Sequence, residues 1–396
     1  MAIIDFQAEA EALRDELVAR RRDLHMHPEL AFEEVRTAGI VAQTLGELGL
    51  EVQTGVGKTG VVGILEGAQD GPTVLVRADM DALPIQEANQ SDYVSTVPGK
   101  MHACGHDGHT SILLGVAKLL AGRRAEIAGR VKFVFQPAEE TGKGAKAMVA
   151  DGVLRDPKPD VSLGLHLWNP LPFGVFGVAD GPVMAGASTF DITISGKGGH
   201  AALPHLNNDP IVCAAQLVTA LQSIVSRNVD PLDTAVITVT SVHAGDAYNV
   251  TPQQAVLKGT FRTFSHAMRD LLTRRIAEVS EAVCRAMNCA VEVDIRHDTD
   301  PVINHPEVSA RVRNALRAVV GEDKFDLSMR TMGAEDMSAL MTDIPGMYFF
   351  VGARDRNADG YYGHHHPKFS FDEDALPLAV AAMTAAISAF VIPETP

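Results

Sequence analysis

The densest group of side chains able to do chemistry lies in residues 101–110, which read MHACGHDGHT. One cysteine, three histidines and one aspartate stand in this segment, and thiolate, imidazole and carboxylate groups are the usual ligands of zinc in proteins. A structural zinc site needs four such ligands, whereas a catalytic site keeps one position open. The segment by itself is compatible with a structural site, a catalytic site or a polar turn, so partners elsewhere in the chain must decide.

Further acidic and histidine side chains stand where predicted strands end. They are Asp79, Asp81, Glu139, Glu140 and His166. Taken singly, the aspartates are compatible with turns, the glutamates with a helix start and the histidine with a hydrogen-bonded core position. Open α/β sheets, however, bind ligands at the edge where their strands end. We therefore expect these side chains to converge there with Cys104 and His106.

The adjacent glutamates match the needs of metal-dependent hydrolysis. Hydrolysis at a metal needs one carboxylate that binds the metal and a second, unligated carboxylate that takes a proton from water. Neighbouring residues in a turn point in different directions, so Glu139 and Glu140 can divide these two tasks.

Other motifs are weaker or misleading. The internal GHHHP at 363–367 is compatible with a surface turn, and GGHAALPH around His200 with a flexible glycine hairpin. The GVGKTG at 55–60 has Val52 where a phosphate-binding loop needs glycine, and it leads into a predicted strand, which excludes that function. No HExxH motif is present, which excludes the common helical zinc-protease arrangement.

The elements that must position these residues form two groups. From about 61 to 166, short apolar segments alternate with helical periodicity, which is typical of an α/β fold with a mainly parallel sheet and helices on both faces. Residues 187–297 instead follow the order β-α-β-β-α-β of a ferredoxin-like α+β module. We predict a discontinuous catalytic, metal-binding domain of residues 1–186 and 298–396, with an inserted lid and dimerisation domain of residues 187–297.

Composition narrows the class of protein. The 396 residues suffice for two domains, and 34 basic against 50 acidic residues give a net charge of −16, which disfavours nucleic acid as a partner. The N-terminal segment lacks the features of a signal peptide, and no apolar run approaches the roughly 20 residues of a membrane span. Four cysteines are too few for a disulfide framework in this chain. We expect a cytoplasmic protein without a nucleic-acid or membrane partner.

Nine segments resemble the motifs of one known family and stand in its order: RADMDALP, MHACGHDGHT, FQPAEETGKGA, GLHLW, GKGGHAALPH, NVTP, GTFR, GAEDM and HHHPKFSFDEDAL. The family is the metal-dependent amidohydrolase branch of the aminoacylase and carboxypeptidase metallopeptidases. This branch includes hippurate hydrolase, N-acyl-amino-acid amidohydrolases and auxin-conjugate hydrolases. The resemblance covers essentially the whole chain.

The resemblance implies a metal centre of two divalent ions, with zinc as the first expectation and manganese, cobalt or nickel as alternatives. The implied ligands are Cys104, His106, Glu140, His166 and His365. Cys104 would bridge the two ions as a thiolate, and Asp81 would hold a ligand in place. Asp79 stands where other branches of the family have a histidine ligand, and it is not counted as one.

The choice of His365 rests on its spacing to Pro367. Three histidines stand in a row where the family motif has one, so His364 and His366 are the alternatives.

The resemblance also implies a reaction, the hydrolysis of the amide bond of an N-acyl amino acid. Glu139 would be the general base, and His200 would polarise the scissile carbonyl or stabilise the oxyanion, reaching in from a partner subunit. Asn249 and Arg262 would bind the carboxylate end of the substrate, since a guanidinium suits a carboxylate well. The expected assembly is a homodimer or higher homo-oligomer formed through the inserted domain.

Two alternatives stay open. The first is an enzyme on the same scaffold that acts as a short-peptide carboxypeptidase or as a deacetylase of N-acetylated biosynthetic intermediates. The second is a catalytically silent protein that binds a metal or a metabolite.

Overall fold

The computed structural model describes residues 5–357 and 360–393, and the chain divides into two compact units. The large unit comprises Met1–Val183, Ile303–Arg330 and Asp336–Pro396, and the inserted unit comprises Met184–Val302 and Thr331–Glu335. The inserted unit thus extends a few residues beyond the predicted 187–297 at both ends. It also takes in the short segment 331–335, which has no periodicity that would have indicated this.

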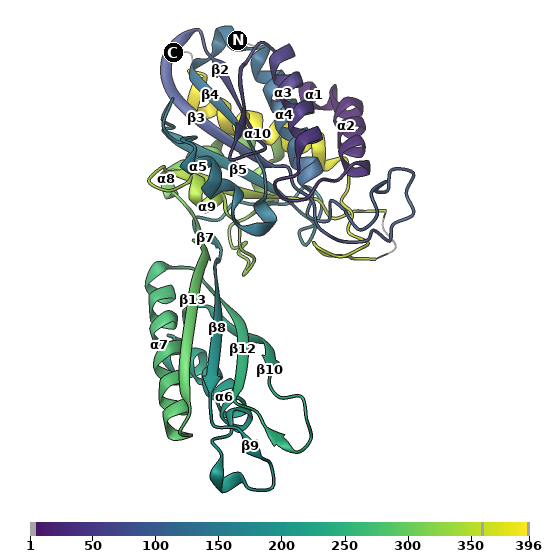
Figure 1. Ribbon diagram of the computed structural model, residues 1–396. Helices are drawn as coiled ribbons and strands as arrows, with labels where there is room; N and C mark the ends of the chain where they lie inside the picture. The colour runs from purple at the N-terminus through teal and green to yellow at the C-terminus, as the bar shows by residue number, and fades with distance from the viewer. Residues whose placement is uncertain (1–4, 358–359, 394–396) are drawn as a thin grey trace. The chain divides into compact units, whose positions relative to one another are not determined.

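The large unit is built on an eight-stranded sheet of order β1-β2-β4-β3-β5-β16-β6-β15 (Figure 1). The strands are β1 (Glu51–Val56), β2 (Gly60–Glu66), β3 (Gln69–Asp79), β4 (Ala128–Gln136), β5 (Val161–Trp168), β6 (Phe176–Gly177), β15 (Phe325–Asp326) and β16 (Gly346–Gly352). The central strands β4, β3, β5 and β16 run parallel, whereas β1 and β2 add to one side in antiparallel fashion. Because β5 and β16 are buried along nearly their whole length, apolar residues predominate in both and do not alternate strictly with polar ones. The predicted mainly parallel sheet is confirmed.

Helices flank this sheet, as predicted. They are α1 (Phe6–Glu11), α2 (Arg14–Met26), α3 (Val35–Glu47), α4 (His106–Ala121), α5 (Gly144–Ala150), α8 (Pro306–Val320), α9 (Met337–Leu340) and α10 (Ala375–Val391), with short 3-10 turns η1 (Arg124–Glu126), η2 (Glu139–Thr141) and η4 (Glu322–Lys324). The helices α4 and α10 pack against each other and against β3, while α5 packs against β4 and α9. The alanine-rich α10 is buried on nearly all sides, and its small side chains permit the close approach of α4 and α8.

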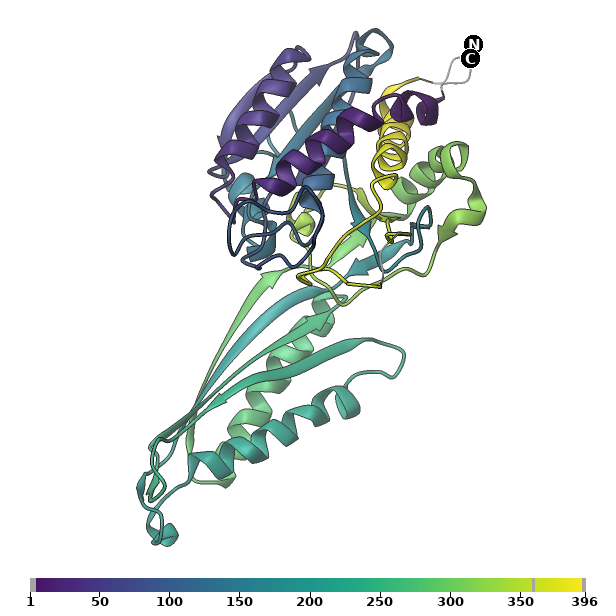
Figure 2. The same cartoon turned by 90° about the vertical axis from the view of Figure 1, so that its right-hand side faces the viewer.

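The inserted unit has its own four-stranded antiparallel sheet, of order β10-β12-β8-β13, with both helices on one face (Figure 2). Its main elements are β8 (Gly186–Ser195), α6 (Pro210–Asn228), β10 (Ala235–His243), β12 (Gln254–Thr263), α7 (His266–Ala286) and β13 (Ala290–Thr299), accompanied by β9 (Gly199–His200), η3 (Pro204–Leu206) and β11 (Val250–Thr251). Buried and partly exposed positions alternate along β12, as one packed face requires. The predicted ferredoxin-like arrangement is confirmed. The segments β7 (Gly181–Met184) and β14 (Val302–Asn304) lead into and out of this unit.

One helix among the described residues, α6, has the length and apolar composition that could cross a membrane. Its buried side chains belong to the core of the inserted unit, where Leu217 and Leu221 lie in one cluster with Phe190 and Leu257 of the sheet. The apolar composition of α6 is therefore explained by packing within this unit.

Candidate metal centre

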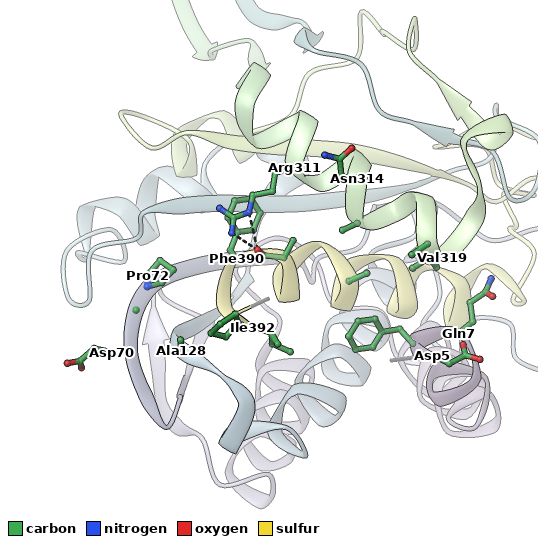
Figure 3. A pocket seen from close by; sticks show the side chains of 17 residues that line it. Asp5, Gln7, Asp70, Pro72, Ala128, Arg311, Asn314, Val319, Phe390 and Ile392 are labelled. Carbon is green, nitrogen blue, oxygen red and sulfur yellow. Dashed lines mark hydrogen bonds between the residues drawn. The ribbon is translucent and has the colours of Figure 1, made fainter. Parts of the chain in front are cut away.

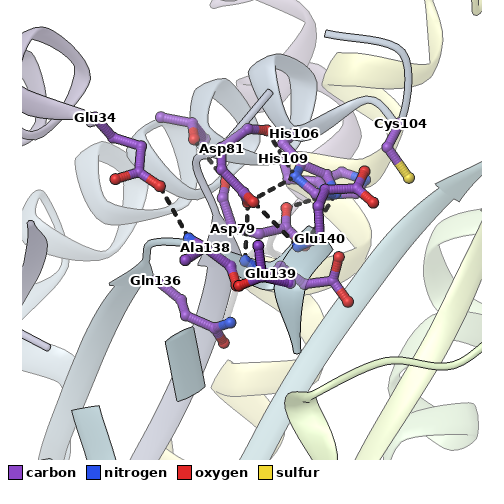
Figure 4. Close-up of polar contacts among 12 residues, drawn as sticks. Glu34, Asp79, Asp81, Cys104, His106, His109, Gln136, Ala138, Glu139 and Glu140 are labelled. Atoms are coloured by element: carbon purple, nitrogen blue, oxygen red, sulfur yellow. Dashed lines mark hydrogen bonds and ion pairs between the residues drawn. The ribbon is translucent and has the colours of Figure 1, made fainter. Parts of the chain in front are cut away.

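The predicted site residues of the large unit lie at the edge of the sheet where the parallel strands end (Figure 4). Asp79 is the last residue of β3, Glu139 and Glu140 form the turn η2 after β4, and His166 lies near the end of β5. His106 is the first residue of α4. The sheet thus collects groups that stand far apart in the sequence.

Cys104 belongs to two groups of candidate ligands at once. Its sulfur lies within 4.8 Å of ligand atoms of His106 and His166, and in a second group it lies within the same distance of ligand atoms of Glu140 and His365. The Sγ atom of Cys104 is 3.6 Å from Nε2 of His166. A left-handed glycine at position 105, with φ of 94°, allows the chain to turn sharply between Cys104 and the start of α4. The five predicted ligands are therefore brought together around one sulfur.

The two buried histidines of this cluster, His106 and His166, direct their Nε2 atoms toward its centre. Nδ1 of His106 lies 2.9 Å from the main-chain oxygen of Asp81, and Nδ1 of His166 lies 2.8 Å from that of Leu167. A carbonyl can only accept, so each Nδ1 carries a proton, and in the neutral imidazole each Nε2 then keeps a lone pair. Within the part of the chain that the structure describes, Nε2 of His106 and Oε1 of Glu140 are buried without a hydrogen-bond partner. These orphaned atoms fit a bound cation, because buried polar atoms are otherwise satisfied.

The carboxylate of Asp81 holds both glutamates and one histidine in place. Its Oδ1 accepts the N–H of Glu139 at 3.0 Å and lies 3.2 Å from Nδ1 of His106, and its Oδ2 accepts the N–H of Glu140 at 3.0 Å. Asp81 is buried. These contacts are compatible with the predicted role of Asp81, which is to hold a ligand in place.

Asp79 forms a further group of candidate ligands with His106 and His109, and its carboxylate is paired with protein side chains. It is fully buried, and its two oxygens lie 2.8 Å from Nη1 of Arg77 and 2.6 Å from Nδ1 of His109. Burial by itself would raise the pKa of Asp79, but the Arg77 guanidinium and the imidazoles of His106 and His109 hold that pKa well below its usual range. Nε2 of His109 accepts the N–H of Leu167 at 2.9 Å, so both nitrogens of His109 are used. The pair of Asp79 and His109 thus supports the strand ends.

The run of three histidines separates in the structure. Nε2 of His365 lies 3.3 Å from Oε2 of Glu140, in the group that contains Cys104. The ring of His364 stacks on Trp168 with a centroid distance of 4.5 Å. The ring of His366 stacks instead on that of Tyr362. Of the three, the structure places His365 among the candidate ligands.

Glu139 lies beside the candidate ligands. One of its carboxylate oxygens is within 4.8 Å of ligand atoms of His106 and Glu140, and the side chain is half-buried. This position is within reach of a small molecule held next to the cluster, as a general base requires.

A buried ion network behind the 101–110 segment was missed by the sequence reasoning. Oδ2 of Asp107 lies 2.9 Å from Nε of Arg21 and 2.7 Å from Nδ1 of His25, whose Nε2 lies 3.1 Å from Oε1 of Glu87. Burial alone would raise the pKa of Asp107, but the charge of Arg21 and the hydrogen bond from His25 hold it below its usual range. Arg21 and His25 stand four residues apart on α2, a spacing that reads equally as a solvated polar face.

The three predicted site residues of the inserted unit do not form one group in a single chain. His200 of β9 pairs with Val250 of β11, and the carbonyl of Asn249 accepts the N–H of Ala201 at 3.0 Å, so His200 and Asn249 lie side by side. Arg262 is near the other end of the sheet.

The size of this separation follows from the residue pairs of β8 and β12. Arg262 pairs with Ala187 at the start of β8, while Gln254 pairs with Ser195 at its end, from which the chain leads to His200. With a rise of about 3.3 Å per residue, these two ends of β8 lie roughly 25 Å apart. The shared role predicted for Asn249 and Arg262, binding one substrate carboxylate, is therefore not available to both residues of the same chain.

A cavity of about 1140 Å³ lies at the opposite end of the large unit, between α8, the end of α10 and the start of β4 (Figure 3). Arg311 lines this cavity. Its guanidinium donates to the main-chain oxygen of Ala389 at 2.6 Å and packs on the ring of Phe390. The cavity contains neither histidine nor cysteine. We therefore place the candidate site at the Cys104 cluster.

Known proteins resemble this chain along most of its length. A sequence profile of peptidase family M20/M25/M40 matches residues 75–389. The chain is 38% identical over 378 residues to thermostable carboxypeptidase 2 of Saccharolobus solfataricus, covering 94% of this chain and 95% of that protein. It is 39% identical over 377 residues to N-acetylcysteine deacetylase of Bacillus subtilis, covering 93% of this chain and 95% of that protein.

Among solved structures, the YXEP protein of Bacillus subtilis, described as a dinuclear metal-binding peptidase of the M20 family, has a TM-score of 0.83 at 35% identity. The match covers 95% of this chain and 98% of that one.

Proposed function

The chain belongs to peptidase family M20/M25/M40 and is a hydrolase acting on amide bonds, and from this premise we propose that its substrates are N-acyl amino acids. The observation that carries the proposal is the position of Cys104 in two groups of candidate ligands, next to the glutamate pair. The relative named N-acetylcysteine deacetylase supports the substrate class, since that name describes the removal of an acyl group from an amino acid.

Five residues of this chain would hold two divalent metal ions. Cys104 would be shared as a thiolate, His106 and His166 would complete one group, and Glu140 and His365 the other. Imidazole, carboxylate and thiolate together suit zinc, and manganese, cobalt or nickel are the alternatives. The ions, when bound, would supply the polarisation of the amide carbonyl and the lowering of the pKa of a water molecule.

Glu139 would move the proton. Its carboxylate would accept a proton from the water that attacks the carbonyl carbon, and would then deliver this proton to the nitrogen of the leaving amino acid as the C–N bond breaks. The N–H of Glu139 is bonded to Asp81, which supports a fixed position for the base. The products are a carboxylic acid and a free amino acid.

The inserted unit would supply the remaining groups from two subunits. Arg262 would bind the substrate carboxylate, and His200 would stabilise the developing oxyanion from a partner subunit, with Asn249 next to it. The separation of Arg262 from the other two along β8 supports a homodimer or higher homo-oligomer in which the inserted unit serves as lid and dimerisation domain.

A hydrolysis panel tests the proposal. The metal-stripped protein is reconstituted separately with zinc, manganese, cobalt or nickel, and is offered hippurate, N-acetyl amino acids and dipeptides while amino acid release is followed by chromatography. We expect kcat/KM for the best N-acyl amino acid to exceed that for dipeptides at least about tenfold. Preference for dipeptides would instead favour the short-peptide carboxypeptidase, which the carboxypeptidase relative supports. Absence of turnover with every metal and substrate would favour a silent binding protein.

A further inference from the structure

Three successive main-chain N–H groups at the glutamate pair all donate to buried carboxylates. Those of Glu139 and Glu140 donate to Asp81, as described above. The preceding N–H, that of Ala138, donates to Oε1 of Glu34 at 2.9 Å. Figure 4 shows Glu34 next to Asp81, with its dashed line running to Ala138. Two carboxylates from distant parts of the chain thus accept hydrogen bonds from three successive N–H groups of one short turn.

The turn held in this way has a disfavoured conformation. Ala138 has φ of 53° and ψ of 37°, in the left-handed region that residues with a β-carbon rarely adopt. Such a conformation persists only where the surroundings enforce it. Because Ala138 directly precedes Glu139 and Glu140, its dihedral angles set the directions in which both side chains leave the strand end.

Burial and further hydrogen bonds fix the carboxylate of Glu34 in the position that this contact needs. It is completely buried, and the same Oε1 atom accepts the N–H of Phe32 at 3.0 Å, a second left-handed residue with φ of 64°. Its other oxygen, Oε2, accepts the hydroxyl of Thr59 at 2.5 Å. Among the described residues, the groups of candidate metal ligands do not include Glu34, so its effect on the site passes through the turn.

We propose that Glu34 is a positioning residue for the amide hydrolysis: by holding Ala138 in its left-handed conformation, it directs Glu139 toward the substrate and Glu140 toward the metal. The inference rests on the proposed function for the roles of those two glutamates. The conformation of the turn itself can be measured independently of both.

The Glu34→Ala variant tests the link. Loss of the residue that orients a ligand or base costs about 10–100-fold in activity or metal affinity, so we expect kcat and the affinity for zinc each to fall by about this factor, with KM changing less than about threefold. In the metal-free protein, hydrogen exchange at residues 138–140 is expected to accelerate about tenfold or more, because one N–H of the turn loses its acceptor.

Two variants separate positioning from packing. Glu34→Gln preserves all three contacts, since the amide oxygen can accept both N–H groups and the amide nitrogen can donate to Thr59, so it is expected to restore kcat and slow exchange. Thr59→Val removes only the third contact, and it is expected to leave the exchange of residues 138–140 unchanged even where it lowers stability. Where Glu34→Ala does not fold, Glu34→Asp, which is one methylene shorter, is expected to show the same losses.

The possible outcomes are distinct. Rapid exchange in Glu34→Ala or Glu34→Asp that is absent in Glu34→Gln and Thr59→Val supports the inference, even when no amide hydrolysis is found and the proposed function fails. Unchanged exchange, zinc affinity and kcat in both Glu34→Ala and Glu34→Asp would overturn it. Equal losses in Thr59→Val and Glu34→Ala would also overturn it, because the effect would then be one of packing alone.

Discussion

The two units present their candidate residues in opposite ways. At the strand ends of the large unit, Asp81, His106 and His166 are buried. Asp81 and His106 are fixed by partners from other segments, and Nδ1 of His166 is bonded to the main-chain oxygen of Leu167 in its own strand. In the inserted unit, His200 is exposed, and its Nδ1 accepts the N–H of Ala202, two residues further along the same loop. The buried set is oriented by the fold of its own unit, whereas His200 and Asn249 lie on a surface and Arg262 is half-buried.

Because of this difference, we expect substitutions in the two units to affect different measured properties. Changes among the buried groups of the large unit are expected to disturb metal binding or folding, because their partners would be left unsatisfied. Changes at the exposed residues of the inserted unit are expected to alter turnover and leave folding intact. The following variants test that contrast, from the largest expected effect to the smallest.

Glu139→Gln is expected to have the largest effect. The amide cannot accept a proton from water, so kcat should fall by about 10²–10⁴-fold, while metal content should stay at the wild-type level because Glu139 is not among the proposed ligands. Steady-state kinetics and elemental analysis of the same preparation check both parts. Near-normal turnover would refute the assignment of Glu139 as the base.

Arg21→Met tests the buried support behind the 101–110 segment. It leaves Asp107 buried without its cationic partner, and removing one member of a buried pair costs about 3–5 kcal/mol in the free energy of unfolding. The matched control is Arg36→Met, which breaks an exposed pair with Asp23 and should cost no more than about 1 kcal/mol. Urea unfolding of both variants measures the difference, and equal losses would show that the network adds nothing to stability.

His200→Ala examines the exposed set. We expect kcat to fall by about 10²–10³-fold through loss of oxyanion stabilisation, with metal content unchanged and the free energy of unfolding altered by no more than about 0.5 kcal/mol. Mixing this variant with Glu139→Gln should recover part of the activity if the histidine acts in a partner subunit. Failure of mixed oligomers to regain turnover would count against that arrangement.

Arg262→Lys is expected to have the smallest effect. Lysine keeps the charge but lacks the planar fork that binds a carboxylate through two hydrogen bonds, so KM should rise about tenfold and kcat should change little. Comparing an N-acyl amino acid with its amide, which lacks the carboxylate, identifies the contact. An unchanged KM ratio between these two substrates would separate Arg262 from carboxylate binding.

The strand-end cluster could be predicted from the sequence because the topology of a parallel sheet determines where its strands end. Asp79, Glu139 and His166 follow apolar runs that form neighbouring parallel strands, and parallel strands end at one edge. The ferredoxin-like order of the inserted unit was likewise readable from periodicity. Both conclusions depend on local patterns that determine where a residue lies in the fold.

The burial of Glu34 and Arg21 could not be predicted in this way. The charged residues before α3 and along α2 read as solvated, and their burial depends on packing against segments that stand far away in the sequence. The separation of Asn249 from Arg262 follows instead from the extended strand β12 (Gln254–Thr263) between them, which the predicted strand order already contained.

The metal content of a Cys104→Ser variant tests the central claim, that Cys104 joins two metal ions, most directly. Wild-type protein and a Cys289→Ser control, which changes a buried cysteine of the inserted unit, are reconstituted with zinc, desalted and assayed by elemental analysis. We expect about two zinc ions per chain in both, and fewer than about one in Cys104→Ser, with loss of turnover. Two retained zinc ions and wild-type turnover in Cys104→Ser would contradict the account.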